Sequence, residues 1–286
     1  MSDAVQKLAP ESFPPLLSEI TDPPAKLYIR GTLPPEDHVL LAVVGSRRYS
    51  NYGKEACEHL IAGLAGYPIS IVSGLALGID ALAHRAALKA GLHTIAVPGS
   101  GLGDEVLYPA TNRSLARDIL SAGGALLSEF EPDFRATEWS FPQRNRIMAG
   151  LSRAVLIIEA SEKSGTLITA RLALDYNRDV MVVPGSIFSD TSRGALKLLK
   201  DGANAVMRPR DILSILGFSV DAVPSQEHLL LSPDEERVLV ALAEPLARDD
   251  LIRSLNIPVR DANILLSAME LRGLIKETMG MIQKWH

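Results

Sequence analysis

Residues 39–74 read VLLAVVGSRRYSNYGKEACEHLIAGLAGYPISIVSG, and this stretch decides the fold. It contains an apolar run at 39–45, a helical pattern at 51–66 and a second apolar run at 70–74. Near-continuous Val/Ile/Leu strands are typical of a parallel sheet with both faces covered, because such strands are buried on both sides. The stretch therefore predicts a strand, a crossover helix and a parallel strand.

The same alternation continues along the chain. Further strands are predicted at 93–99, 124–130, 153–160, 178–185 and 204–207. Helices are predicted between them, at 79–90, 112–121, 142–150, 165–177, 193–201 and 210–216. This order predicts an α/β domain with a doubly wound, mostly parallel, Rossmann-like sheet.

Changes in composition divide the sequence into four parts. Residues 1–37 are rich in proline and are expected to form an extended lead-in with one short helix, before a Rossmann-like domain at 38–217. Residues 218–231 lack periodicity and are interpreted as a linker. Residues 232–286 are expected to form a small α+β winged helix, with three amphipathic helices and a hairpin. Its helices are predicted at 233–243, 247–255 and 258–272, and Gly280 lies in the middle of the hairpin.

Composition limits the classes of function. The net charge of −5 excludes a polycation that coats nucleic acid, so any phosphate binding must be local. The single cysteine, Cys57, excludes an internal disulfide, and no Cys/His group has the spacing of zinc ligands. The N-terminus has no apolar leader pattern, and no run of eighteen apolar residues occurs. We therefore expect a cytoplasmic protein that is neither exported nor membrane-spanning.

The loops that follow the predicted strands contain most of the candidate binding residues. In an open α/β sheet, ligands bind beyond the carboxyl ends of the strands. These loops hold glycines, hydroxyl groups and cations in an arrangement that suits an anion. The side chains and free backbone groups concerned are Ser46, Arg47, Arg48, Arg113, Lys163, Ser164, Gly165 and Thr166. Each glycine or hydroxyl alone is explained by turn or cap chemistry, whereas their convergence favours a phosphate site.

The segment SFPQRNRIMAG at 140–150 places two cations where a helix disfavours them. Arg144 and Arg146 fall in the first turn of a predicted helix, whose free N–H groups already carry partial positive charge. A negative group is therefore expected nearby. Two kinds of partner are open, a bound phosphate or one of the neighbouring carboxylates Glu129, Glu131, Asp133 and Glu138.

Several cofactor and enzyme classes lack their motifs. No phosphate-binding loop of the ATPase type is present, and arginines stand where a dinucleotide fingerprint has its second glycine, so no cofactor is predicted. The six histidines lie outside the strand-end loops, and no catalytic set is evident. Two alternatives stay open. One is a nucleotide-binding or nucleotide-cleaving enzyme in which Glu159 activates water. The other is a purely structural or sensor role, with the winged helix as a regulatory module.

Seven segments follow one another along the chain: VVGSRRYSNYG, SGLALGIDALAHRAAL, TIAVPGSGLGDEVLYPATNRSL, LLSEF, FPQRNRIMAGLS, AVLIIEASEKSGTLITARLAL and VMVVPGS. Together, and in this order, they resemble the DprA (Smf) family of DNA-processing proteins. The resemblance covers about residues 13–217. It implies a protein without catalytic activity that binds single-stranded DNA and dimerises through the Rossmann-like domain. It also implies that the protein loads RecA recombinase onto incoming strands during natural transformation.

The resemblance also implies a set of DNA-binding residues. The family's GSR arginine falls on Arg47, its FPxRNR motif on residues 141–146 and its SGT segment on residues 164–166, with Phe141 available to stack on a base. The complete expected set is Ser46, Arg47, Arg48, Arg113, Phe141, Gln143, Arg144, Asn145, Arg146, Lys163, Ser164, Gly165 and Thr166.

Two features depart from the family pattern. Many members carry lysine where this sequence has Ala110, a loss for which Arg113 is expected to compensate, and residues 1–12 are too few for the N-terminal helical domain of other members. Residues 219–286 hold eleven acids and seven bases, a net charge of −4. A helix that reads a DNA groove is usually basic, so the winged helix is expected to contact protein or to bind duplex DNA weakly.

Overall fold

The computed structural model describes residues 4–219, 232–242, 244–255, 257–271, 273–278 and 280–284. The chain divides into two compact units, Met1–Val220 and Asp221–His286, and each is described by itself. Most of the predicted linker lies outside the described residues.

The larger unit alternates strands and helices as the sequence predicts. Its elements are β1 (Gln6–Leu8), η1 (Pro10–Ser12), α1 (Pro15–Ser18), β2 (Leu27–Gly31), β3 (Val39–Val44), α2 (Asn51–Ala62), β4 (Ile69–Ser73), α3 (Ile79–Lys89), β5 (His93–Ala96), η2 (Ala110–Asn112), α4 (Arg113–Ser121), β6 (Ala125–Ser128), α5 (Ser140–Leu151), β7 (Ala154–Ile157), α6 (Thr166–Asp175), β8 (Asp179–Val182), α7 (Arg193–Lys200), β9 (Asn204–Ala205) and α8 (Pro209–Ile215).

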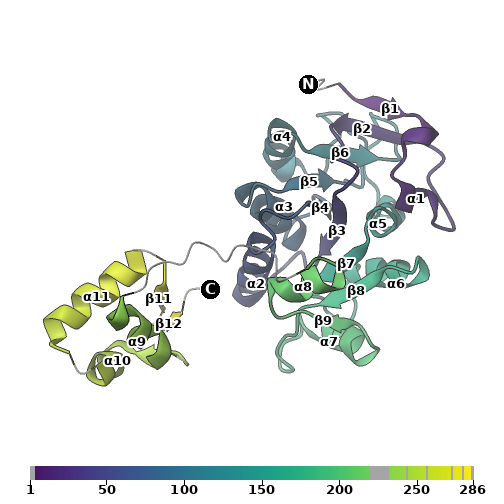
Figure 1. The fold of residues 1–286 in the computed structure, drawn as a ribbon. Helices are drawn as coiled ribbons and strands as arrows, with labels where there is room; N and C mark the ends of the chain where they lie inside the picture. The colour runs from purple at the N-terminus through teal and green to yellow at the C-terminus, as the bar shows by residue number, and fades with distance from the viewer. Residues whose placement is uncertain are drawn as a thin grey trace. The chain divides into compact units, whose positions relative to one another are not determined.

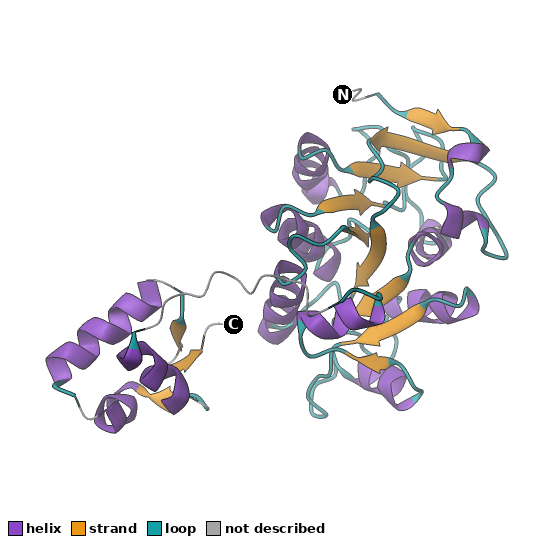
Figure 2. Ribbon diagram, viewed as in Figure 1, coloured by secondary structure: helices purple, strands orange, loops and turns teal. Residues whose placement is uncertain are grey.

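One sheet runs through the larger unit in the order β1-β2-β6-β5-β4-β3-β7-β8-β9. From β6 to β9 all neighbouring strands are parallel, whereas β2 is antiparallel to both β1 and β6. Helices cover both faces of the sheet (Figure 1; Figure 2). The predicted doubly wound, mostly parallel, Rossmann-like fold is therefore confirmed.

Alternate residues of the central strands divide the core between the two faces. Val44 of β3 packs in the cluster that includes residues of α1, α5, α6 and α7. Its neighbour Val43 packs in the cluster that includes residues of α2, α3 and α8. The period of two along a strand sends successive side chains to opposite faces, so an uninterrupted apolar strand fills both layers.

The N-terminal segment differs from the predicted lead-in. Instead of standing apart from the domain, it adds β1 and β2 to one end of the sheet, and Leu17 of the short helix α1 is fully buried in the core. The signal was the run LYIRG at 27–31, whose Leu27, Tyr28 and Ile29 are buried although prolines flank it on both sides. Proline restricts the residues around it but does not exclude a strand between two prolines.

The smaller unit contains three helices and a three-stranded sheet in the order β10-β12-β11. Its elements are α9 (Pro233–Ala241), β10 (Leu246–Ala247), α10 (Arg248–Leu255), α11 (Val259–Leu271), β11 (Ile275–Thr278) and β12 (Met281–Lys284). Val238, Leu251, Leu266 and Ile282 form a core that belongs to this unit alone. This arrangement is the predicted winged helix, with the short strand β10 in addition to the hairpin.

Candidate nucleic-acid interface

A cleft of about 710 Å³ lies beyond the carboxyl end of β3 and is walled by the loops after β3, β4 and β7, by the loop before α7 and by the start of α5. The connection after β3 leads to β4 on one side, whereas β7 lies on the other side of β3. The crevice at such a switch point is the usual ligand site of a doubly wound sheet. Nine predicted residues line it: Ser46, Arg47, Arg48, Phe141, Arg144, Asn145, Ser164, Gly165 and Thr166.

Arg47 and Arg48 are exposed on the first of these loops. The loop packs closely on the start of α3, where Ile79 N donates to Ser46 O at 3.1 Å. Two glycines permit this contact, because a Cβ on Gly78 would lie 2.2 Å from Ser46 O and one on Gly45 would lie 2.7 Å from Ile79. Gly78 also has φ +88°, in the region that favours glycine. The close packing leaves both guanidinium groups at the surface.

Arg144 has the opposite environment, since only 4% of its surface is exposed. Its guanidinium donates to Val97 O and, at 2.5 Å, to Gly74 O, the carbonyls just beyond β5 and β4. Asp80 lies close by and accepts from Gly74 N at 3.1 Å. Burial lowers the pKa of Arg144 to about 10, and burial also raises the pKa of Asp80 against the opposing effect of the Arg144 charge. Arg144 therefore forms part of the cleft wall with its donors directed to the protein.

Arg146 also has partners within the chain and does not line the cleft. Its guanidinium donates to the Glu129 carboxylate and, at 2.7 Å, to Asp22 O. Burial raises the pKa of Glu129, and the Arg146 charge opposes that rise. Of the four carboxylates considered as partners from the sequence, the structure selects Glu129. The negative groups expected beside the first turn of α5 are thus protein carbonyls and a carboxylate, so of the two kinds of partner that the sequence left open, the protein's own groups are present.

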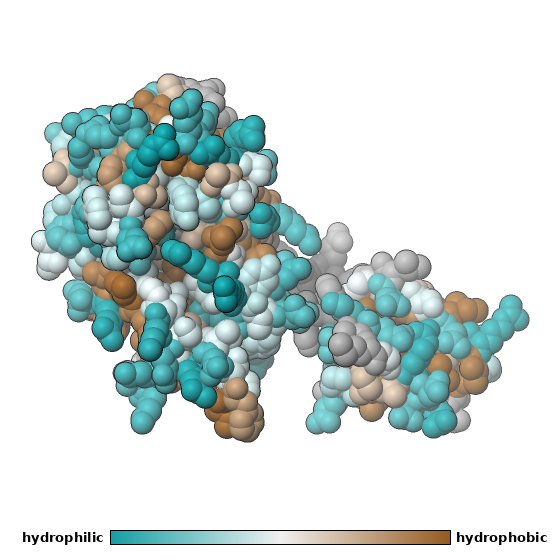
Figure 3. Space-filling model, turned by 180° about the vertical axis from the view of Figure 1, so that it is seen from behind, coloured by the Kyte–Doolittle hydropathy of each residue, from teal (hydrophilic) through white to brown (hydrophobic). Residues whose placement is uncertain are grey.

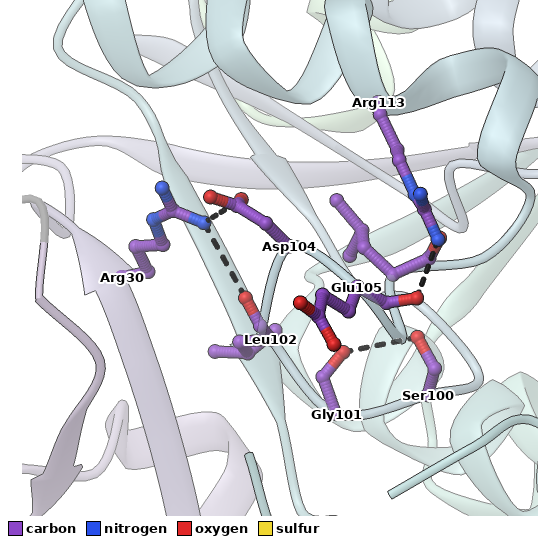
Figure 4. A network of polar contacts seen from close by, with 8 residues as sticks. Arg30, Ser100, Gly101, Leu102, Asp104, Glu105 and Arg113 are labelled. Carbon is purple, nitrogen blue, oxygen red and sulfur yellow. Dashed lines mark hydrogen bonds and ion pairs between the residues drawn. The ribbon is translucent and has the colours of Figure 1, made fainter. Parts of the chain in front are cut away.

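Arg113 holds its own loop instead of lining the cleft. Its guanidinium donates to Leu107 O at 3.1 Å and to Glu105 O at 2.5 Å. Figure 4 shows Arg113 and Arg30 in this network, where Arg30 contacts Asp104 at 2.5 Å. These contacts fix residues 98–113, which follow β5. The expected replacement of a lysine-phosphate contact by Arg113 therefore finds no support in the geometry.

Lys163 and Gln143 also lie outside the cleft lining. Lys163 is exposed and precedes Ser164, which lines the cleft. Gln143 is half-buried close to the Glu129 carboxylate and lowers the pKa of that group. Gln143 thus supports the Arg146 ion pair.

Glu159 links three loops by hydrogen bonds at the edge of the cleft. It is 2% exposed and accepts from Ser50 N at 2.9 Å, from Ser50 Oγ at 2.6 Å and from Thr191 Oγ1 at 3.0 Å. Both carboxylate oxygens are engaged, so this arrangement suits a structural group better than a base that activates water. Thr191 and Ile168 also line the cleft and were missed from the sequence; the spacing of Ser164 and Ile168 along the start of α6 was the available signal.

In the winged helix, two polar residues of α11 differ in their partners. Asn263 accepts from Arg248 at 3.2 Å, and Arg248 also contacts Glu277 at 2.6 Å. Arg260 is exposed at the start of α11, while Arg272 lies outside the described residues. Among the described residues, no group of three His, Cys, Asp or Glu side chains could hold a metal ion. No described helix combines the length and apolar character needed to span a bilayer.

Comparisons with known proteins agree with this architecture. The family model for DNA recombination-mediator protein A matches residues 5–217, and the model for the DprA winged helix domain matches residues 220–281. The chain belongs to the DprA family. It is 39% identical over 279 residues to Protein Smf of Escherichia coli, covering 94% of this chain and 74% of that one.

Two solved structures show the same fold as the larger part of the chain. The X-ray structure of DNA processing protein A from Streptococcus pneumoniae is 40% identical, with a TM-score of 0.69 over 75% of this chain and 74% of that one. DprA from Helicobacter pylori, whose structure describes a single-stranded DNA binding mode, is 33% identical, with a TM-score of 0.65 over 74% of this chain and 95% of that one.

Proposed function

We propose that this DprA-family protein binds single-stranded DNA across the cleft of its Rossmann-like unit and acts without catalysis in DNA recombination. The observation that carries the proposal is the pair of exposed cations, Arg47 and Arg48, which line one cleft together with the hydroxyl groups of Ser164 and Thr166. A phosphate accepts hydrogen bonds from both walls of such a site. The single-stranded DNA binding mode described for the relative from Helicobacter pylori supports the same reading.

Within the proposed DNA-binding set, the residues divide into two roles. Arg47, Arg48 and Lys163 are exposed and would contact phosphates directly. Arg144 and Arg146 have protein partners and would shape the site instead. Arg113, Gln143 and Asn145 would support the surrounding loops and the start of α5.

The test is a fluorescence anisotropy titration of labelled oligonucleotides at several salt concentrations. Three phosphate contacts would give a slope of log K against log salt of about −2 for single strands. Arg47→Ala and Arg48→Ala should each reduce the slope by about 0.7. Arg117→Ala, an exposed arginine on α4 away from the cleft, is the matched control and should change nothing. A slope near zero, or equal affinity for duplex and single strand, would contradict the proposal.

We further propose that the protein acts as a homodimer that loads RecA recombinase onto incoming strands in natural transformation. Few phosphate contacts per subunit give weak binding, and pairing two sites raises the effective concentration of the second. Several exposed apolar side chains of the larger unit are candidates for contact with a second copy: Leu174, Ile187, Phe188 and Met207. Figure 3 shows a brown, hydrophobic projection at the lower end of the larger unit.

Two measurements test this assembly. Light scattering after size-exclusion chromatography should give twice the mass of the chain, and Phe188→Asp should shift it toward the monomer. RecA assembly on a long single strand should be faster in the presence of the natural chain than with the Arg47→Ala variant. A monomeric mass at all concentrations, or equal RecA assembly rates, would contradict the assembly model.

A further inference from the structure

The ring of Phe141, expected from the sequence to stack on a base, is largely occupied by the protein. The Arg47 guanidinium carbon lies 5.3 Å from the ring centroid. A Cβ on Gly99 would lie only 2.6 Å from the Phe141 ring, so the Gly99 backbone packs directly against it. The third neighbour is the ring of Tyr108, with centroids 5.6 Å apart and planes inclined by 51°.

Tyr108 is the member of this aromatic pair that presents open surface. Its relative exposure is 48%, whereas Phe141 is half-buried. An exposed aromatic side chain beside a cation-lined cleft is the combination that single-strand binding proteins use, because each base has a flat π-face and each nucleotide has a phosphate. Arg47 and Tyr108 contact the same Phe141 ring, so they lie close enough to serve one short stretch of strand.

The loop that carries Tyr108 is held rigidly. Tyr108 N donates to Ser100 Oγ at 3.2 Å, and Arg113 binds the carbonyls of Leu107 and Glu105 (Figure 4). A side chain on a fixed backbone loses less conformational freedom when a ligand stacks on it, so more of the stacking energy appears as affinity. The hydrogen bonds of Arg113 thus hold the loop that exposes the Tyr108 ring, instead of binding phosphate.

We propose that Tyr108 is a stacking subsite for a nucleobase, adjoining the phosphate-binding cleft. The proposal rests on the proposed single-stranded DNA binding and adds to it the group that recognises the base. Stacking accepts any base, so the subsite does not read sequence. It favours single strands over duplexes, because a base in a duplex has both faces covered by its neighbours.

The test compares two ligands of equal length, a labelled oligodeoxythymidylate and an abasic sugar-phosphate strand. Tyr108→Ala should weaken binding of the oligodeoxythymidylate roughly tenfold, the value of one stacked base. It should leave binding of the abasic strand and the salt slope unchanged, since no charge is removed. Tyr108→Phe, which keeps the ring, should retain the natural affinity.

Tyr108→Leu is the second variant, because it preserves apolar contact with Phe141 but has no aromatic face. It should show the same loss of affinity as Tyr108→Ala, which separates stacking from packing. Equal loss of affinity for both ligands would overturn the inference and assign Tyr108 a role in holding the loop. Unchanged affinity of Tyr108→Ala for oligodeoxythymidylate would overturn the inference while leaving the proposed function intact. Failure of the natural chain to bind either ligand would overturn both.

Discussion

Two arginines of the cleft show how environment decides what a cation does. Arg47 is exposed and its guanidinium lies over the Phe141 ring, whereas Arg144 is 4% exposed and donates to two backbone carbonyls. A buried guanidinium whose N–H groups already donate to backbone carbonyls has few donors left for a ligand. Removing it leaves those carbonyls without donors. Arg47 therefore belongs to the proposed binding surface and Arg144 to the framework beneath it.

Arg144→Ala should lower the free energy of unfolding by about 3 kcal/mol, the usual effect of removing one partner from a buried charged network. Asp80 would then be buried close to the cavity without its neighbouring cation. Urea unfolding followed by circular dichroism measures the change. Arg48→Ala is the control, because an exposed side chain without such partners should change stability by less than about 0.5 kcal/mol. Equal stability of the two variants would show that the Arg144 network is dispensable.

His84 should make the protein less stable in acid. It is fully buried, its Nδ1 lies 2.7 Å from Thr94 Oγ1, and burial lowers its pKa to about 3. Between about pH 6.5, where an unfolded histidine titrates, and pH 3, the unfolded chain binds a proton that the folded chain does not. The contribution of the neutral His84 side chain to the free energy of unfolding is complete above pH 6.5. It decreases as the pH falls toward 3, by up to about 1.4 kcal/mol per pH unit.

The measurement is urea unfolding of the natural chain and of His84→Gln from pH 7 to pH 4. The difference in the free energy of unfolding between the two proteins isolates the effect of His84, because Asp80 and Glu129 titrate in both. The stability of the natural chain relative to the variant should fall as the pH falls. A constant difference would show that His84 becomes protonated in the folded protein.

Among the elements, α2 shows how a helix start is fitted to the cleft. Its N-cap, Ser50, accepts from Gly53 N at 3.1 Å and donates to Glu159 at the end of β7. Gly53 lies directly against that carboxylate, because a Cβ there would be 2.4 Å from Glu159 Oε2. The glycine therefore permits the close approach of helix and strand end on which the loop arrangement depends.

Gly53→Ala should destabilise the larger unit by about 2 kcal/mol, the usual effect of overpacking, although alanine normally favours a helix over glycine. Gly165→Ala is the matched control at the start of α6. A Cβ on Gly165 meets nothing within 4 Å, so that variant should be neutral or slightly stabilised. Thermal unfolding distinguishes the two, and a stabilised Gly53→Ala variant would show that Glu159 moves aside without cost.

At the scale of the whole molecule, the two units have separate hydrophobic cores. Three clusters lie entirely within the larger unit, and the fourth lies entirely within the winged helix. The candidate cleft draws its described lining from the larger unit only. Folding and single-strand binding are therefore expected to belong to the larger unit.

A chain that ends after Ser219 should keep the unfolding transition of the larger unit within about 2 °C, because no residue of its core is removed. Its affinity for single-stranded oligonucleotides should equal that of the full chain at the same salt concentration. Calorimetry and anisotropy measure the two quantities. A large loss of affinity with unchanged melting would show that the winged helix takes part in strand binding.

Local patterns predicted the elements well because they reflect local physics. The apolar run at 39–45 became β3, and the segment at 165–177 became α6, with boundaries that shifted by at most two residues. The segment 27–31 was interpreted as lead-in because prolines surround it, although its pairing with β6 depends on residues almost one hundred positions away. Pairing with a distant strand is not encoded in the pattern of one strand.

The sequence by itself determined the alternation of strands and helices from β3 onward and the strand-end loops that carry the candidate residues, because apolar periodicity and strand-end position follow from chain geometry. Only the tertiary structure decided which of the cations in those loops are free. Arg146 binds the backbone of Asp22, 124 residues away, and Arg144 binds carbonyls that follow two other strands. A charged side chain is directed by the field of all groups that folding brings around it, and that field exists only once the chain has folded.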